Sequence, residues 1–392
     1  MSNHFIYLDH AATTPVDPRV LEAMMPYFNE KFGNPSSLHS IGQQAKKAQD
    51  SARKEIATIL GCAAQEVVFT GSGTESDNLA ILGIAKAYAK RGKHIITTKI
   101  EHPAVLEACQ HLEKNGFKIT YLPVDNDGLI QLDDLGKALT KETILVSIIY
   151  ANNEIGTIQP ISEIAALLKK HSNPELGRPP IFHTDACQAA CSLDIQVDSL
   201  GVDLMTLNAG KIYGPKGIGL LYVRKGTKIE PLIYGGGHEF GLRSGTENIP
   251  AIVGFATALK LAQDSYQKEA ARLTSLRGRL LTGLQKLPDI ILNGHAQKRL
   301  SNNLNLTIKG VEGETLVIHL DTAGIAASSG SACSSGKTEP SHVLLALGHS
   351  KQEAYQSLRF SLGRSTTKED IDQVIEQFTT IINEARQESG TY

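Results

Sequence analysis

The chain has 392 residues, more than a single hydrophobic core usually organises, so a large domain with a smaller companion is expected. Its 39 basic and 41 acidic residues leave a net charge near zero, without the basic stripe that binds nucleic acid or an anionic membrane. There is no apolar run of membrane-spanning length, no signal-peptide pattern and no disulfide framework among the five scattered cysteines. These features predict a cytoplasmic protein that binds small molecules or proteins, with no nucleic acid and no membrane.

Short apolar runs rich in β-branched residues alternate with longer amphipathic stretches in the first part of the chain. The stretch 43–60 has helical spacing of its apolar residues, and Gly61 follows it as a C-terminal stop. This alternation predicts an α/β fold with a mostly parallel central sheet. The predicted strands are residues 67–69, 95–98, 144–149, 181–184 and 204–207.

The pattern changes after about Pro250 to a long polar helix, short strands around residues 303–308 and a final helix. We therefore expect a large domain over residues 16–260 and a small α+β domain over residues 261–392, with residues 1–15 packing against the small domain. A Gly- and Ser-rich segment, about residues 326–340, indicates a mobile loop in the small domain, and Cys333 lies in its middle.

Small and polar residues follow the first predicted strand, in the segment 70–76, and a helix comes next. Gly73 and Thr74 would stand at the helix N-terminus, where free N–H groups bind phosphate. A tight turn without a ligand explains this segment equally well. Ser76 replaces the third glycine of the dinucleotide-binding pattern, which disfavours a dehydrogenase that binds NAD.

Two further strand ends carry groups that suit catalysis. Asp185 ends one strand and Lys211 follows the next, at the edge where open parallel sheets bind ligands. The lysine could form a Schiff base and the aspartate could hold a cationic partner. The alternatives are an N-cap role for Asp185 and a solvated surface charge for Lys211.

His102 also follows a strand, so its imidazole could stack on a flat ring or move protons, although a structural histidine is the simpler interpretation. His183, Cys187 and Cys191 recur every four residues, which we attribute to helix packing, and no metal site is predicted. Cys333 differs because its loop should leave the thiol accessible, as reactive cysteines require. The alternative is that Cys333 is an exposed thiol without a role in catalysis.

These segments resemble, over nearly the whole chain, the group I cysteine desulfurases of the NifS/IscS type within the class V aminotransferase family. The family's fold is the fold type I of enzymes that depend on pyridoxal 5'-phosphate. The matching segments are 7–9, 12–15, 32–37, 74–76, 101–102, 152–154, Asp185, Gln188, 211–217, 243–246, 328–333 and 359–361.

The resemblance implies roles for residues that would bind the cofactor. Lys211 would hold it as a Schiff base, Asp185 would pair with its ring nitrogen and His102 would stack on the ring. Gln188 and Asn153 would hydrogen-bond the phenolic oxygen of the ring. The phosphate would be held by Gly73, Thr74 and Asn208, with Thr246 reaching across from a second subunit, which implies a homodimer.

The resemblance also implies the substrate and the reaction. Arg359 would bind the carboxylate of L-cysteine, assisted by Asn34 and Asn153. Cys333 would attack the substrate sulfur, which leaves L-alanine and a persulfide on the protein. The persulfide would go to sulfur-acceptor proteins such as an iron–sulfur scaffold, or to tRNA thiolation.

The chain departs from the family pattern at two positions near the lysine. The family usually has Ser or Thr three residues before the lysine and His directly before it, where this chain has Asn208 and Gly210. Asn208 can still donate through its amide, whereas Gly210 offers no side chain, so a weaker hold on the cofactor is expected. The alternatives are a selenocysteine lyase, another class V enzyme, or a catalytically silent scaffold for sulfur transfer.

Overall fold

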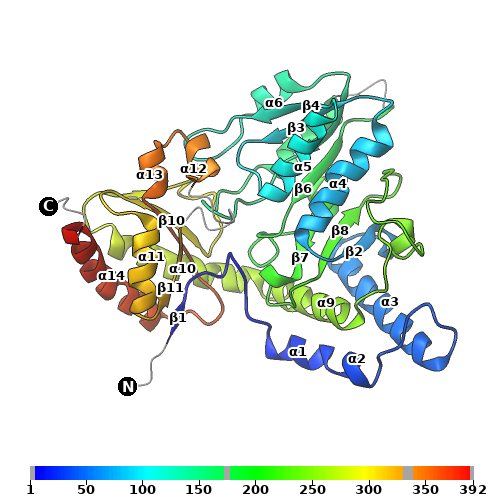
Figure 1. Cartoon of the computed structure of the whole chain (residues 1–392), viewed down its shortest axis with the longest axis horizontal. Helices are drawn as coiled ribbons and strands as arrows, with labels where there is room; N and C mark the ends of the chain where they lie inside the picture. Colours follow the sequence, from blue (N-terminus) through cyan, green and yellow to red (C-terminus); the bar gives the residue numbers. More distant parts are fainter. Residues whose placement is uncertain (1–4, 172–176, 330–338, 389–392) are drawn as a thin grey trace.

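The computed structural model describes residues 5–171, 177–329 and 339–388. A seven-stranded sheet of order β2-β8-β7-β6-β5-β3-β4 forms the centre of the larger part (Figure 1). All neighbours pair in parallel except the two pairs that involve β8, so the mixed, mostly parallel sheet is confirmed. The strands are β2 (Val67–Thr70), β3 (His94–Thr98), β4 (Lys118–Leu122), β5 (Thr143–Ser147), β6 (Ile181–Asp185), β7 (Leu204–Asn208) and β8 (Gly219–Val223).

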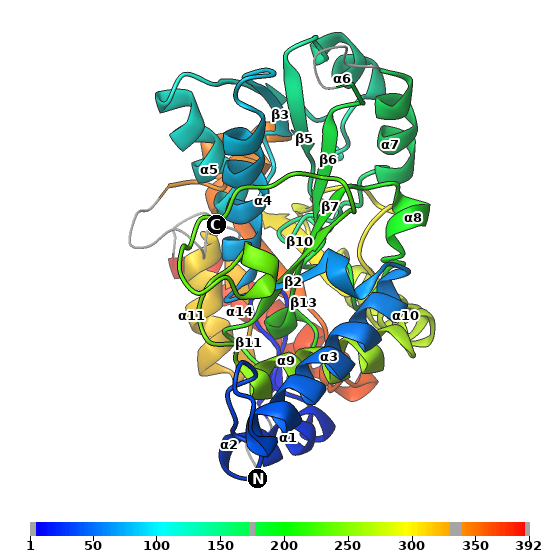
Figure 2. The ribbon, with the colours of Figure 1, turned by 90° about the vertical axis from the view of Figure 1, so that its right-hand side faces the viewer.

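Helices cover both faces of this sheet because successive strand residues point to opposite sides (Figure 2). Ile181 of β6 packs on one side with α4 (Gly73–Tyr88) and α5 (Pro103–Lys114), and its neighbour Phe182 packs on the other. The second face is covered by α3 (Ser40–Leu60), α6 (Leu132–Ala138), α7 (Ile161–Lys170), α8 (Val197–Leu200) and α9 (Ile249–Gln263), with α1 (Pro18–Met24) and α2 (Pro26–Asn29) packed outside on α9.

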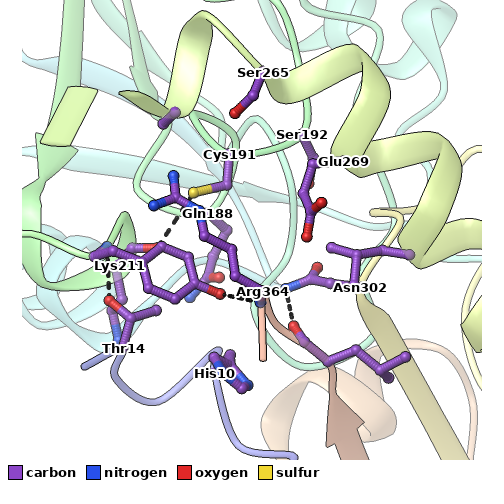
Figure 3. A pocket seen from close by; sticks show the side chains of 14 residues that line it. His10, Thr14, Gln188, Cys191, Ser192, Lys211, Ser265, Glu269, Asn302 and Arg364 are labelled. Carbon is purple, nitrogen blue, oxygen red and sulfur yellow. Dashed lines mark hydrogen bonds between the residues drawn. The ribbon is translucent and has the colours of Figure 1, made fainter. Parts of the chain in front are cut away.

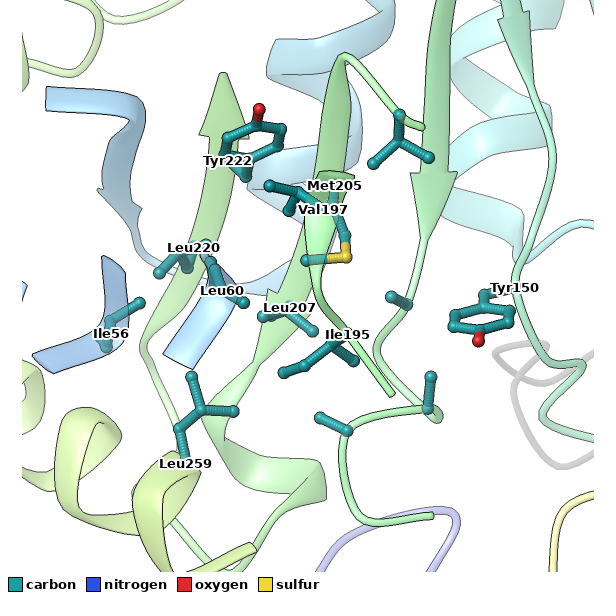
Figure 4. Close-up of a cluster of buried hydrophobic side chains, with 14 of the residues drawn as sticks. Ile56, Leu60, Tyr150, Ile195, Val197, Met205, Leu207, Leu220, Tyr222 and Leu259 are labelled. Atoms are coloured by element: carbon teal, nitrogen blue, oxygen red, sulfur yellow. The ribbon is translucent and has the colours of Figure 1, made fainter. Parts of the chain in front are cut away.

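The core on this second face joins the sheet to α3 and α9 (Figure 4). Ile56 and Leu60 of α3 and Leu259 of α9 meet Met205 and Leu220 of the sheet, and all five side chains are fully buried. The helix α3 ends where the sequence predicted, because Gly61 adopts the left-handed conformation with φ 70. This packing holds the carboxyl ends of the strands in a fixed arrangement.

The smaller part is built on an antiparallel sheet of order β12-β13-β10-β9 with its own core. Two-stranded pairing of β1 with β11 joins the N-terminal segment to this part, as Figure 1 shows. The elements are β1 (Ile6–Tyr7), α10 (Tyr266–Leu284), β9 (Ile290–Leu292), β10 (Asn303–Ile308), α11 (Gly313–Thr322), β11 (Ile325–Ala326), β12 (Ser328–Ser329), α12 (His342–Ala346), α13 (Lys351–Tyr355), β13 (Ser357–Ser361) and α14 (Lys368–Glu388).

The separate cores support a division of the chain into two domains. We propose a large domain over residues 16–260 and a small one over residues 261–392, with residues 1–15 packed on the small one. Ile6 and Leu8 belong to the same core as residues of α10, α11 and α14, whereas α9 belongs to the core of the large sheet. The boundary then falls at the junction of α9 and α10.

Two local predictions are wrong. The long polar helix after Pro250 is two helices, α9 and α10, separated at Ser265, whose φ of −125 and ψ of 0 are not helical. The segment with Cys187 and Cys191 forms turns after β6 rather than a helix, so helix packing does not explain the spacing. Among the described residues, no cluster of potential metal ligands occurs and no helix is long and apolar enough to cross a membrane.

Candidate active site

A cavity of about 220 Å³ opens at the carboxyl edge of the large sheet, where β2, β6 and β7 end. The small domain closes it through Arg359 of β13, and the N-terminal segment closes it through Ala11 and Ala12. The predicted site residues that line this cavity are Gly73, Thr74, His102, Asn153, Asp185, Gln188, Asn208, Lys211 and Arg359.

Lys211 enters the cavity from the short 3-10 turn Ala209–Lys211 that follows β7. Its Nζ donates to the carbonyl oxygens of Ala11 at 2.9 Å and Ala12 at 2.6 Å. Thr14 ties the same N-terminal segment to this turn, because its N–H and its hydroxyl both donate to the Gly210 carbonyl. The lysine is therefore a partly buried amine held by backbone, rather than a solvated surface charge.

Asp185 ends β6 with 5% of its surface exposed, and it lines the cavity. Its Oδ1 accepts the Cys187 N–H at 2.9 Å, so the carboxylate also shapes the turn that follows the strand. The structural role considered from the sequence is thus a turn contact rather than a helix cap. The carboxylate remains available to a cationic group in the cavity.

Two further buried carboxyl groups lie near Asp185. Burial, and then the charge of Asp185, hold the pKa of Asp77 well above its usual range. Burial raises the pKa of Glu101 to about 8, even though the Thr98 hydroxyl and the Ile149 N–H donate to its carboxyl group. His183 lies 3.7 Å from Asp77, and burial lowers the pKa of this histidine to about 4. Glu101 therefore keeps most of its proton near pH 7, and burial favours the protonated form of Asp77 as well.

His102 precedes α5 and caps it, because its Nδ1 accepts the Ala104 N–H at 3.1 Å. That bond assigns the proton of the neutral ring to Nε2. Burial lowers the pKa of His102, which favours the neutral form. The imidazole thus combines the structural role with a place in the cavity wall. Gln188 lies in the same wall and donates to the Ala11 carbonyl at 3.0 Å.

The first turn of α4 forms an anion-binding end of the cavity. Ser72 caps the helix by accepting the Glu75 N–H at 3.1 Å, and Gly73 and Thr74 line the cavity. A Cβ on Gly73 would lie 2.9 Å from the Cys187 sulfur and 3.3 Å from the Asn208 amide nitrogen. A side chain at this position would crowd Cys187 and Asn208, so with glycine there the wall is backbone with an amide donor beside it.

Arg359 approaches from the middle of β13 with 4% of its surface exposed. Its Nη1 donates to the Asn153 carbonyl at 3.1 Å and its Nη2 to Asp9 at 2.8 Å. Each of these terminal nitrogens carries a second N–H, so the guanidinium, which lines the cavity, retains donors for a ligand, whereas its Nε is buried without a partner within the described part of the chain. A carboxylate is the group that such a donor edge recognises best.

Two predicted site residues lie elsewhere, and a third is not among the described residues. Asn34 and Thr246 are exposed and do not line the cavity, and Asn34 accepts the Ser36 N–H at 2.9 Å. Cys333 lies outside the described residues.

The sequence reasoning missed Asp77, although its place three and four residues after Thr74 and Gly73 puts it on the same face of α4. The contribution of Ala11 and Ala12 was also missed, because they act through backbone carbonyls and their side chains carry no functional group.

A second, smaller cavity of about 30 Å³ lies behind Lys211 and Gln188 (Figure 3). Its walls come from the N-terminal segment, the large domain and the small domain, and include His10, Asn302 and Arg364. This volume admits no more than a few ordered waters. The chemistry therefore belongs to the larger cavity, where an amine, a carboxylate, an imidazole, a helix N-terminus and a guanidinium suit a flat anionic cofactor and a carboxylate substrate.

Comparison with known proteins agrees with this geometry. Residues 6–374 match the aminotransferase class-V family. The chain is 50% identical to the cysteine desulfurase IscS of Dictyoglomus turgidum, over 97% of this chain and 95% of the relative. It is also 50% identical to the IscS of Methanosarcina thermophila, over 98% and 93% of the two chains.

Solved structures show the same similarity. A NifS-like protein superposes with a TM-score of 0.91 at 38% identity, covering 97% of this chain and all of the other. The protein SspA, solved in complex with cysteine, superposes with a TM-score of 0.80 at 38% identity, covering 91% of this chain and 98% of the other.

Proposed function

The chain belongs to the aminotransferase class-V family, and from that premise we infer that it is a cysteine desulfurase that depends on pyridoxal 5'-phosphate. Its substrate is L-cysteine, and the sulfur passes to acceptors. One structural observation carries the inference: Lys211, Asp185 and Arg359 line a single cavity. The reaction needs an amine that binds the cofactor and a guanidinium that binds the carboxylate of the amino-acid substrate, and this cavity offers both.

The residues of the cavity fit the cofactor. The glycine wall at Gly73 and the N-terminus of α4 suit its phosphate, with the Asn208 amide beside them in place of the family's usual hydroxyl. We propose that Thr74 and Asn208 donate to the phosphate, that Asp185 holds the proton on the ring nitrogen, and that His102 lies against the ring. Gln188 and Asn153 would donate to the phenolic oxygen.

The cofactor supplies an electron sink for the charge that develops at the substrate α-carbon. Lys211 carries the proton in this reaction, since its Nζ is the amine of the cavity wall. The carbonyls of Ala11 and Ala12 give that Nζ a hydrogen-bonded position beside the cavity. Arg359 and Asn153 hold the substrate carboxylate, which orients the α-proton toward the lysine. Asn34 would assist from outside the described cavity wall.

The sulfur acceptor of the chain is Cys333 in our proposal. Its thiolate attacks the substrate sulfur, an S–S bond forms, and the carbon–sulfur bond breaks with its electron pair left on carbon. That carbon takes a proton and becomes the methyl group of alanine. Burial raises the pKa of Cys62 and Cys109 to about 12 and of Cys191 to about 11, and it also raises the pKa of Cys187. These four thiols are poor nucleophiles near neutral pH.

We propose a homodimer in which Thr246 reaches the phosphate site of the partner subunit. Thr246 is exposed, in a segment with the exposed aromatic residues Tyr234 and Phe240. Phe32 and Leu38 are also exposed, and a dimer interface that covered such apolar side chains would remove them from water. The acceptor would be an iron–sulfur scaffold or the machinery of tRNA thiolation. The four described cysteines are free thiols, which suits the reducing cytoplasm that we propose as the compartment.

Lysine replacement tests the assignment. Lys211→Ala should remain folded yet release no alanine from L-cysteine, because no other amine among the described residues lines the cavity wall. Lys225→Ala, which removes an exposed lysine, is the control and should retain wild-type turnover. Borohydride reduction and peptide mapping of the wild type should place the cofactor on Lys211. A cofactor found on Lys216 or Lys225, or normal turnover by Lys211→Ala, would refute the proposal.

A further inference from the structure

We propose that Asp9 is a positioning residue for substrate recognition, because it holds Arg359 so that one edge of the guanidinium faces the substrate carboxylate. This inference rests on the proposed function, in which Arg359 is the carboxylate fork. Asp9 itself does not line the cavity and acts through the arginine. The Asp9 carboxylate accepts one N–H of the guanidinium and so determines which N–H groups remain for the substrate carboxylate.

Strand pairing brings Asp9 to Arg359. Asp9 pairs in parallel with Ser361, the last residue of β13, and Arg359 lies two residues earlier on the same face of that strand. The Ser361 N–H donates to the Leu8 carbonyl at 2.7 Å, and the His10 N–H donates to the Ser361 carbonyl at 3.1 Å. The carboxylate is thus fixed beside the guanidinium by backbone on both sides.

The turn after Asp9 is also hydrogen-bonded. The Tyr7 hydroxyl donates to the carbonyls of Asp9 and Thr13, each at 3.0 Å, and the Ala12 N–H donates to the Asp9 carbonyl at 3.1 Å. The Ala11 N–H donates to the Ser361 hydroxyl at 2.9 Å. Asp9 is therefore a rigid partner for Arg359 rather than a free surface carboxylate.

The hydrogen bonds of Arg359 within the protein determine which of its N–H groups remain for the substrate carboxylate. Nη1 donates to the Asn153 carbonyl and Nη2 donates to Asp9, which leaves the second N–H of each terminal nitrogen for a ligand, while Nε is buried without a partner among the described residues. Glu154 is the other nearby carboxylate, but its Oε2 accepts the Ser341 hydroxyl at 2.5 Å. Asp9 is thus the only carboxylate in an ion pair with Arg359 in the described ranges. Without it the guanidinium could turn and aim another edge at the cavity.

The test compares Asp9→Asn with Asp17→Asn. Asp17 follows the N-terminal segment as the N-cap of α1 and pairs with Arg364 of the small domain at 3.0 Å, and neither Asp9 nor Asp17 lines the larger cavity. Arg364 lies instead at the smaller cavity (Figure 3). The control therefore removes a neighbouring carboxylate that also pairs with an arginine of the small domain, without touching Arg359. For each variant we would measure kcat, KM for L-cysteine, the Kd for L-alanine by calorimetry, and Tm.

Asp9→Asn should raise KM for L-cysteine and Kd for L-alanine roughly tenfold, because a charge-assisted hydrogen bond becomes a neutral one, while kcat changes less than about threefold. Asp17→Asn should change Tm but neither KM nor Kd. In an Arg359→Met background, Asp9→Asn should add no further rise, since its effect passes through the arginine.

Three results would overturn the inference. KM and Kd could be unchanged in Asp9→Asn, they could fall because Asp9 competes with the substrate, or they could rise equally in the Asp17→Asn control. Failure of the proposed function has a different signature. The wild type would then make no alanine, and Arg359→Met would leave the Kd for L-alanine unchanged.

Discussion

Three carboxyl groups share the buried region behind the cavity, and their protonation decides what the site can hold. No lysine or arginine forms an ion pair with Asp77 or Glu101 in the described part of the chain. Burial, and then the charge of Asp185, raise the pKa of Asp77, and burial raises the pKa of Glu101 to about 8, so both carboxyl groups favour their protonated forms. The negative charge at the cavity is then left to Asp185. In the proposed site, this one carboxylate would balance the positive charge of the cofactor ring.

The raised pKa of Glu101 predicts a stability that depends on pH. Its pKa rises from 4.5 to about 8, so the folded state keeps a proton that the unfolded state loses. The contribution is complete below pH 4.5 and is lost as pH rises through 8, by at most about 1.4 kcal/mol per pH unit. Glu101→Gln mimics the protonated acid, so its Tm relative to wild type should rise from pH 5 to pH 8.

The control is Glu107→Gln, which changes an exposed carboxylate on the neighbouring helix α5. Thermal unfolding of the three proteins at both pH values checks the prediction. Parallel Tm profiles for wild type and Glu101→Gln would show that Glu101 is ionised in the folded protein.

At the scale of elements, the strand ends and the first turn of α4 build the site. Ser72 caps α4 and accepts the Glu75 N–H, while the Glu75 carboxylate accepts the Gly71 N–H at 2.8 Å and pairs with Arg243 at 2.8 Å. The turn between β2 and α4 is thereby held from both sides. Free N–H groups of the helix can face a phosphate only while this turn keeps its shape.

Ser72→Ala should therefore weaken both the helix and the hold on the cofactor. Loss of an N-cap costs about 1 kcal/mol of stability, and the Kd for pyridoxal phosphate should rise at least several-fold. The matched control is Ser350→Ala. It removes the hydroxyl group that caps α13 by accepting the Glu353 N–H. It should lower Tm in the same way without changing the cofactor Kd. Equal cofactor affinity in both variants would contradict the role given to the α4 terminus.

The regular elements of the large domain could be predicted from the sequence, because their apolar residues are continuous and buried on both faces. The strands β2, β3, β5, β6 and β7 were recognised in this way, and the helix α3 was recognised by the helical spacing of its buried apolar residues. The strand β4 was missed because it is an edge strand with partly exposed side chains, and β8 because it returns antiparallel after a glycine-rich turn. The break at Ser265 was missed because α9 and α10 differ in burial but both have helical spacing.

At the scale of the whole molecule, the site exists only because three distant parts of the chain meet. Residues after parallel strands could be predicted because those strand ends share one edge of the sheet. The contacts of Lys211 with Ala11 and Ala12, and of Asp9 with Arg359, could not be predicted, since they depend on the path of the N-terminal segment between the two domains. The contacts of Lys211 involve backbone carbonyls, which leave no mark in residue type, and the Asp9–Arg359 ion pair joins residues 350 positions apart in the sequence.

The proposed homodimer predicts that two inactive variants restore each other. Thr246→Val should bind the cofactor weakly in its own dimer, and Lys211→Ala should be inactive. Mixed dimers contain one site with the Lys211 of one subunit and the Thr246 of the other, so alanine production should return to at most about half per dimer. Mixing after mild dissociation and assaying alanine tests this. A lack of recovery in dimers shown to be mixed would mean that Thr246 serves its own subunit.

The central claim is that this chain moves sulfur from L-cysteine to Cys333, and one measurement tests it most directly. Wild type and Cys333→Ser are treated with L-cysteine and pyridoxal phosphate without a reductant, and alanine and protein-bound sulfur are quantified in the first turnover. The wild type should form one alanine for each added sulfur, with that sulfur mapped to Cys333 by mass spectrometry. Cys333→Ser should bind the substrate but form almost no alanine. Added sulfur on Cys62, Cys109, Cys187 or Cys191, or wild-type alanine release by Cys333→Ser, would contradict the account.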